Sequence, residues 1–111
     1  MRGFQLSSLL AIALLVGACG EAPNPSKRDG GGDANRGKQV YLAQCTACHA
    51  SDPAKEGPLG PAVKGSSREL LEARILRSSY PPGYAPKRST TLMPPQPTLE
   101  SDIPDLATFL R

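Results

Sequence analysis

The stretch Gln44-Cys45-Thr46-Ala47-Cys48-His49, QCTACH, contains two of the three cysteines of the chain and its only histidine. Two thiols and one imidazole therefore lie within five residues. Cysteines three positions apart on a helical turn share one face, and the next residue extends the same turn. A site built on this stretch binds a metal directly, works as a redox pair of thiols, or uses the two sulfurs to hold a larger group.

Cys-x-x-Cys-His is the local pattern for covalent attachment of haem. In that interpretation the Cys45 and Cys48 sulfurs form thioethers with the two vinyl groups on one haem edge, and His49 is the proximal iron ligand. Two alternatives remain open. A structural zinc site needs four ligands, and the fourth would be a carboxylate or Cys19. A thioredoxin-like redox pair expects a β-α-β unit, which nothing in this sequence predicts.

A haem iron bound by histidine has a sixth position. Apart from the initiator, Met93 is the only methionine of the chain, in the setting Leu92-Met93-Pro94-Pro95. We predict Met93 as the second axial ligand; the alternative is a methionine that fills the core. Ligation by histidine and methionine raises the reduction potential and leaves no open site. Such an iron passes electrons and does not transform a small-molecule substrate.

The composition leaves little with which to build a core. The 111 residues include 11 glycines, 12 prolines, two phenylalanines and no tryptophan. A chain of this length forms one domain at most, and that domain is marginally stable without a staple. One covalently bound haem c would supply buried apolar surface, so we expect the haem-free protein to be largely unfolded.

We predict an all-α fold, three or so short helices joined by Pro- and Gly-rich loops that wrap around the haem. Asp33 can cap a first helix that begins at Ala34. Ser66 fits the N-cap of a capping box with Glu69 at its third position, which starts a second helix that runs to about Arg77.

The third helix is predicted to begin near Ser101, so that Pro104 falls in its first turn, where a missing N–H costs least. Residues 78–97 contain six prolines and cannot be helical. A long loop of this kind in a small domain usually covers a functional site.

Residues 1–18 have the anatomy of a signal peptide, with Arg2 ahead of the apolar run 6–18. That run is shorter than the roughly 20 residues of a membrane helix. Cys19 ends the sequence VGAC, which resembles the lipobox of bacterial lipoproteins and predicts that Cys19 is lipidated. The alternative is an ordinary cleaved signal with a chance cysteine. Residues 19–32 are then a lipid-anchored flexible linker, and 33–111 form the folded domain.

These features predict an exported protein, anchored to a bacterial membrane at its periplasmic or extracytoplasmic face.

The formal charge of +3 falls to +2 without Arg2, which is no nucleic-acid signature. A local surplus of four positive charges lies between Lys64 and Arg88. It either docks an acidic redox partner or is a solvated face that aids solubility.

Residues 33–111 resemble the class I cytochrome c family. The matching features are Gly37-x-x-x-Tyr41, Cys45-Thr-Ala-Cys48-His49, Gly60-Pro61-Ala-Val63-Lys-Gly65, Met93-Pro94 and Ile103-x-x-Leu106-Ala107-x-Phe109-Leu110. The resemblance implies that the Pro61 carbonyl accepts a hydrogen bond from the His49 ring, which orients it. It also implies that the first and last helices cross at Gly37.

The loop before Met93 lacks the tryptophan that would shield a haem. Packing against the haem is therefore assigned to Val63, Tyr80, Tyr84 and Leu92, and either tyrosine could instead have a simple packing role.

The function predicted from these residues and this resemblance is that of a monomeric, membrane-tethered c-type cytochrome. It would carry single electrons between a redox donor and a redox acceptor, as an electron carrier and not an enzyme. Two alternatives stay open: a dedicated haem c subunit of a redox enzyme complex, and a haem-based sensor with a labile or absent sixth ligand.

Overall fold

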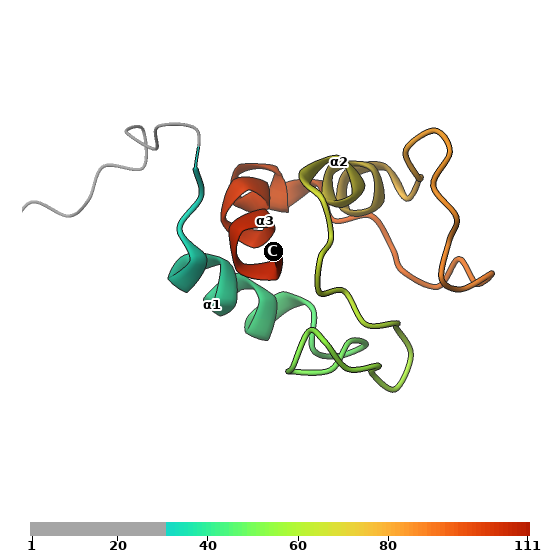
Figure 1. Cartoon of the computed structure of the whole chain (residues 1–111), viewed down its shortest axis with the longest axis horizontal. Helices are drawn as coiled ribbons and strands as arrows, with labels where there is room; N and C mark the ends of the chain where they lie inside the picture. Colours follow the sequence, from blue (N-terminus) through green and yellow to red (C-terminus); the bar gives the residue numbers. More distant parts are fainter. Residues whose placement is uncertain (1–30) are drawn as a thin grey trace, which may run out of the picture.

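The computed structural model describes residues 31–111, and it is helical throughout its regular elements. Five segments follow in order: α1 (Ala34–Gln44), α2 (Arg68–Leu71), the π-helix η1 (Glu72–Leu76), the 3-10 helix η2 (Pro97–Asp102) and α3 (Ile103–Leu110). No strand occurs between residues 31 and 111. The predicted all-α fold is confirmed (Figure 1). The proposed signal peptide, Cys19 and most of the linker lie outside the described residues.

Helix α1 begins where its capping signal predicts. The carboxylate of Asp33 accepts hydrogen bonds from the backbone N–H groups of Asn35, at 2.8 Å, and Arg36, at 3.2 Å. These two donors have no partner inside the helix, and a side-chain oxygen at the N-cap satisfies them. The prediction of an N-cap at Asp33 is confirmed.

The cap predicted for the second helix is wrong by one residue. Ser67 is the N-cap, and its hydroxyl accepts from the Leu70 N–H at 3.1 Å. The Ser66 hydroxyl instead donates to the Val63 carbonyl at 2.6 Å. Gly65 adopts a positive φ of 81°, so Ser66 still belongs to the turn that precedes the helix.

The second helix changes character before it ends. After one α-helical turn it widens into the π-helix η1, and Ser78 then closes it at a positive φ of 50°. The widened turn leaves carbonyls that outside donors use: the Ser79 N–H bonds the Ala73 carbonyl at 3.0 Å, and the Gln96 N–H bonds the Ile75 carbonyl at 2.5 Å. Single π-turns of this kind are frequent at functional sites.

The last helix begins two residues later than expected, at Ile103. The tighter 3-10 helix η2 occupies the preceding residues, with Pro97 in its first turn. Pro104 lies in the first turn of α3, as predicted.

Helices α1 and α3 cross, and their contact forms the centre of the core (Figure 1). A Cβ atom on Gly37 would collide with the Asp105 backbone and lie 2.9 Å from the Cβ of Phe109. The ring of Tyr41 is 5.6 Å from that of Phe109. The predicted crossing at Gly37 is therefore confirmed. The buried apolar cluster consists of Tyr41, Leu71, Ile75, Leu99, Ile103, Leu106 and Leu110.

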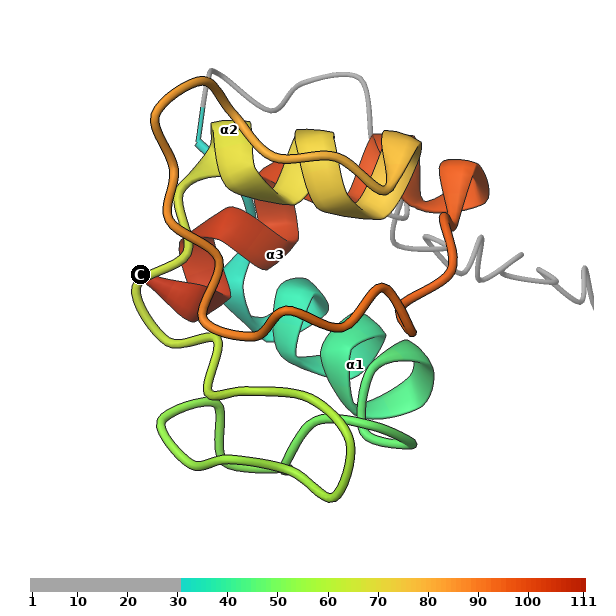
Figure 2. The same cartoon turned by 90° about the vertical axis from the view of Figure 1, so that its right-hand side faces the viewer.

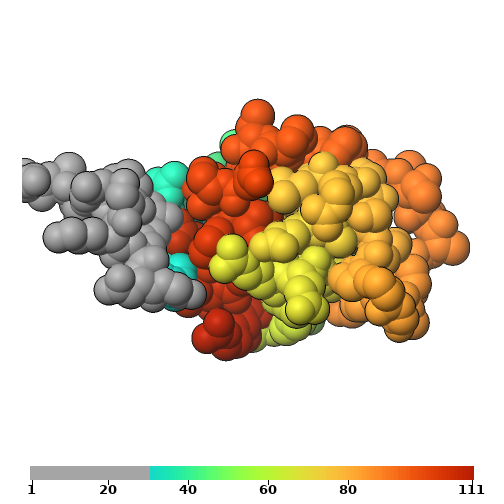
Figure 3. Space-filling model, turned by 90° about the horizontal axis from the view of Figure 1, so that it is seen from above, coloured from blue at the N-terminus to red at the C-terminus, as the bar shows by residue number. Residues whose placement is uncertain are grey.

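Two long connections lie outside this helical frame. Figure 2 shows residues 50–65 as the green loop below α1, and the orange segment that follows η1 as it passes across to η2. In the space-filling view, the residues between about 80 and 90 form one end of the folded part (Figure 3).

No helix among residues 31–111 has both the length and the apolar character needed to cross a bilayer.

Candidate functional site

The CTACH stretch continues the hydrogen bonding of α1 for one more turn. The Cys45 N–H bonds the Tyr41 carbonyl at 2.9 Å, and the N–H groups of Cys48 and His49 bond the Cys45 carbonyl at 3.2 and 3.0 Å. Residues three apart on such a turn share a face. Both cysteines are free of disulfides. The two sulfurs are therefore available on one turn at the end of a rigid helix.

Cys45 faces the interior. It packs against the buried apolar cluster, and this burial raises the pKa of its thiol to about 11. At neutral pH the sulfur is thus held as S–H.

The ring of His49 is held in one orientation by a backbone carbonyl. Its Nδ1 lies 2.9 Å from the oxygen of Pro61, which is the contact that the family resemblance implies. A carbonyl only accepts, so Nδ1 carries the proton and Nε2 keeps a free lone pair. The arrangement presents Nε2 as the nitrogen that can bind a metal, with its tautomer set by the Pro61 bond.

Gly60 is the residue that allows this carbonyl to reach the ring. A Cβ atom at Gly60 would lie 2.5 Å from Cε1 and 2.6 Å from Nδ1 of His49. The N–H groups of Leu59 and Gly60 both donate to the Cys48 carbonyl, at 3.1 and 2.9 Å. The loop is thus bonded back onto the CTACH turn, and only glycine fits between the loop and the imidazole.

Tyr41 ties the same turn to the start of the loop. Its hydroxyl donates to the Ala50 carbonyl at 2.6 Å, directly after His49. Burial raises the pKa of the Tyr41 phenol, with smaller contributions from Cys45 and from the Asp52 carboxylate. The neutral, hydrogen-bonded phenol is therefore the form that the fold stabilises.

Met93 packs against the same buried cluster as Cys45 and Val63. Three segments that are far apart in the sequence thus bring a thiol, a thioether sulfur and a branched apolar side chain to one apolar surface. The Met93 carbonyl accepts a long hydrogen bond of 3.4 Å from the Ser78 hydroxyl.

The other residues assigned to haem packing differ in their surroundings. Tyr80 and Tyr84 stack on each other, with ring centroids 5.4 Å apart and planes 9° apart. The Arg74 guanidinium lies 4.6 Å from the centre of the Tyr80 ring. Leu92, beside Met93, is 69% exposed, and Leu59 in the other loop is 55% exposed. The segments around the site thus present large apolar side chains that no other part of residues 31–111 covers.

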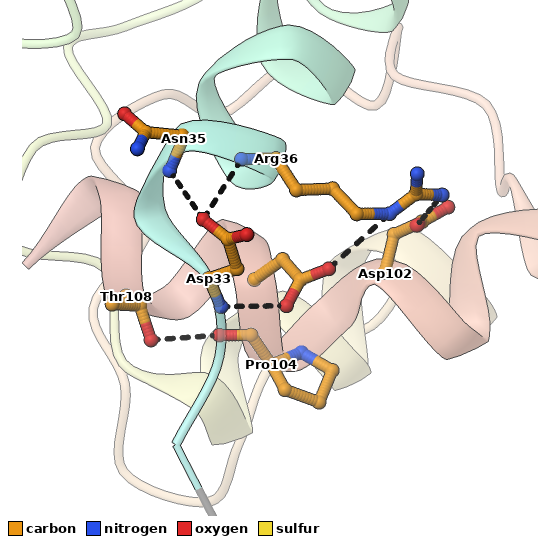
Figure 4. Close-up of polar contacts among 7 residues, drawn as sticks. Asp33, Asn35, Arg36, Asp102, Pro104 and Thr108 are labelled. Atoms are coloured by element: carbon orange, nitrogen blue, oxygen red, sulfur yellow. Dashed lines mark hydrogen bonds and ion pairs between the residues drawn. The ribbon is translucent and has the colours of Figure 1, made fainter. Parts of the chain in front are cut away.

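Sequence reasoning missed a buried acidic residue. Asp105 is fully buried in α3, accepts a hydrogen bond from the Asp33 N–H at 2.8 Å and lies 3.4 Å from the Arg36 guanidinium. Arg36 also pairs with Asp102 at 3.0 Å (Figure 4). A carboxylate inside the apolar pattern of the last helix was the available signal, because a buried charge needs a partner.

The donor set fits a covalently held haem better than a metal ion alone. Within residues 31–111, no three or more histidine, cysteine, aspartate or glutamate side chains gather so as to hold a metal ion. The zinc alternative therefore lacks a ligand set there, and the helical fold offers no β-α-β unit for a thioredoxin-like pair. Two free sulfurs on one turn, followed by an oriented imidazole, are what thioether attachment and axial ligation require.

Comparison with known proteins agrees with this donor set. The family model described as Cytochrome c matches residues 34–111. Neither the curated proteins nor the solved structures gave a significant match. The family match spans most of the chain and includes the whole CTACH turn. The chain therefore belongs to the cytochrome c family, whose members bind haem c covalently and carry electrons.

Proposed function

We propose that the protein is a class I, membrane-tethered electron carrier whose iron is bound by His49 and Met93. The hydrogen bond from His49 Nδ1 to the Pro61 carbonyl, at 2.9 Å, is the observation that carries this proposal. It keeps the proton on Nδ1, orients the ring and leaves the Nε2 lone pair for the iron. Cys45 and Cys48 would hold the haem edge through thioethers on the same turn. The haem supplies the one-electron redox centre.

Met93 is proposed as the sixth ligand because the chain offers no other suitable sulfur. It is the only methionine besides the initiator, and it packs on the same buried cluster as Cys45. An iron with histidine and methionine on its two faces has no open position, which favours electron transfer over ligand sensing or substrate chemistry.

The Met93→Ala variant tests this assignment. The oxidised wild-type protein should show the weak red-region absorption band typical of methionine ligation, and its reduced form should not bind CO. Met93→Ala should lose the band, bind CO and have a lower reduction potential. Leu92→Ala, at the exposed neighbouring position, should keep the band. A wild-type protein that lacks the band and binds CO at once would favour the sensor alternative.

The tether is proposed from the sequence around Cys19. The signal-like residues 1–18, the lipobox-like VGAC and the Pro- and Gly-rich linker 19–32 support an exported lipoprotein. Anchoring would keep the domain at high effective concentration near a membrane-bound donor and acceptor. An inhibitor of lipoprotein signal peptidase should cause a larger precursor to accumulate, and Cys19→Ser should release the protein from the membrane fraction. An unchanged mass and distribution would contradict the tether.

Docking through the basic residues between 64 and 88 has weaker support. Arg68 pairs with Glu72 at 2.9 Å, and Arg74 stacks over Tyr80. Lys87 and Arg88 also contact their own chain. These internal contacts favour the solvated-face interpretation. Reduction by the physiological donor should then depend only weakly on salt, whereas a steep decrease with salt would restore the docking hypothesis.

A further inference from the structure

The segment that holds Met93 has almost no backbone hydrogen bonds to fix it. Residues 80–95 include five prolines, which lack an N–H donor. In the described part of the chain, residues 80–95 make one backbone–backbone hydrogen bond, from the Tyr84 N–H to the Pro81 carbonyl at 3.1 Å. Both of its partners lie within the segment. Backbone hydrogen bonds from Ser79 and Gln96 to η1 fix the two ends of this segment, so its position between those ends depends on side-chain contacts.

Two consecutive cations supply such contacts. The Lys87 ammonium donates to the Ala62 carbonyl at 2.7 Å, and the Arg88 guanidinium pairs with the Glu56 carboxylate at 3.0 Å. Both acceptors belong to the loop 50–65. Ala62 directly follows Pro61, whose carbonyl bonds the His49 ring. The two cations thus connect the Met93 segment to the loop that orients His49.

We propose that Lys87 and Arg88 are positioning residues that clamp the Met93 segment onto the loop 50–65. Closing this clamp sets how readily another ligand displaces Met93 from the iron. The inference rests on the proposed ligation by Met93. It assigns no contact with the haem to either cation, because both act through the backbone and side chains of the opposing loop.

The expected effect is moderate, because the contacts are near the surface. The Arg88 side chain is 34% exposed and that of Glu56 is 72% exposed, so solvent weakens their attraction. The Lys87 bond adds a charge-assisted contact to a backbone oxygen. With few competing contacts along residues 80–95, losing both should still shift the balance between the bound and displaced states of Met93.

Imidazole binding to the oxidised, full-length holoprotein measures this balance, since imidazole must displace Met93 to reach the iron. The double variant Lys87→Gln/Arg88→Gln should bind imidazole three- to tenfold more tightly, which corresponds to about 0.7–1.4 kcal/mol. The matched control is Lys38→Gln/Arg77→Gln, which removes two exposed positive charges from outside the clamp and the loop 50–65. This control should stay within about twofold of wild type, as expected for surface changes.

A charge swap separates the ion pair from a general effect of charge. Glu56→Arg and Arg88→Glu should each tighten imidazole binding, and the two together should return toward the wild-type affinity. Added salt should tighten imidazole binding to the wild-type protein and have less effect on Lys87→Gln/Arg88→Gln.

The red-region methionine band, recorded before each titration, distinguishes two kinds of failure. A wild-type protein without the band would overturn ligation by Met93, and the clamp with it. A wild-type protein with the band, together with clamp and control variants of equal imidazole affinity, would overturn the clamp and leave the proposed function intact. Tighter binding in Lys87→Gln/Arg88→Gln but not in the control, together with near wild-type affinity in the double variant Glu56→Arg/Arg88→Glu, would support the inference.

Discussion

The two long connections of the domain have similar compositions but differ in the number of backbone hydrogen bonds that hold them. Residues 50–65 and 80–95 are both rich in proline and lack regular helices. In the first, the Cys48 carbonyl accepts from the N–H groups of Leu59 and Gly60, and the Pro53 carbonyl accepts from those of Val63 and Lys64. In the second, one internal backbone bond is found. A Pro- and Gly-rich composition therefore does not predict how firmly a loop is held.

The difference divides the proposed haem site into two sides. The side that carries the CTACH turn and Pro61 is fixed by backbone hydrogen bonds and by the close approach of Gly60 to His49. The side that carries Met93 depends on the packing of that side chain and on contacts from residues such as Lys87 and Arg88. Local stability varies across a structure in this way, and weakly bonded segments open first.

The largest effect is expected from loss of the haem, which both connections are proposed to surround. The double variant Cys45→Ala/Cys48→Ala cannot hold the haem covalently, and the remaining small core should leave the chain largely unfolded. Far-UV circular dichroism should show the loss of most helical signal. Native-like helix content in this variant would show that the helical frame is stable without the haem.

The next test compares one glycine from each connection. Gly60→Ala should destabilise the holoprotein by about 1–3 kcal/mol, because its Cβ would overlap the His49 ring. Gly83→Ala places its Cβ in open space but at a φ of +77°, which costs about 1–2 kcal/mol. Denaturant titration gives both free energies. Only Gly60→Ala should also change the reduction potential of the haem. Equal reduction potentials in the two variants would contradict the division into two sides.

A smaller effect with a defined pH dependence is expected at Tyr41. Tyr41→Phe leaves the Ala50 carbonyl without its 2.6 Å hydrogen bond and should cost about 1–2 kcal/mol at neutral pH. Because folding raises the pKa of Tyr41, its contribution is constant below about pH 10 and is lost as the pH rises further. The stability gap between wild type and variant, measured by denaturant titration, should therefore narrow above pH 10. A constant gap would contradict this assignment.

The smallest effect is expected at the junction between η1 and the Met93 segment. Ser78→Gly relieves a positive φ of 50° but removes a weak 3.4 Å hydrogen bond to the Met93 carbonyl. The two effects oppose each other, so the free energy of unfolding should change by less than about 1 kcal/mol. Ser78→Ala keeps the strained φ and loses the bond, so it should be the less stable of the two variants in a denaturant titration.

Much of the frame was predictable from local pattern. The cap at Asp33, the first helix, the place of Pro104 and the crossing at Gly37 all follow from short-range rules or from the family resemblance. The errors are local as well: Ser67 replaces Ser66 as the cap because Gly65 extends the preceding turn. The last α-helix begins late because the 3-10 helix η2 takes its expected first residues.

The sequence alone narrowed the chemistry proposed for this protein, because one histidine, one CxxC pair and one methionine beyond the initiator leave few possible donor sets. Only the tertiary structure decided how those donors are held. The buried Asp105, the fit of Gly60 against His49 and the contacts of Lys87 and Arg88 all join residues distant in the chain. Such contacts depend on which backbone groups and charges come together in the folded chain. Local sequence spacing does not predict them, because the residues are distant in the sequence.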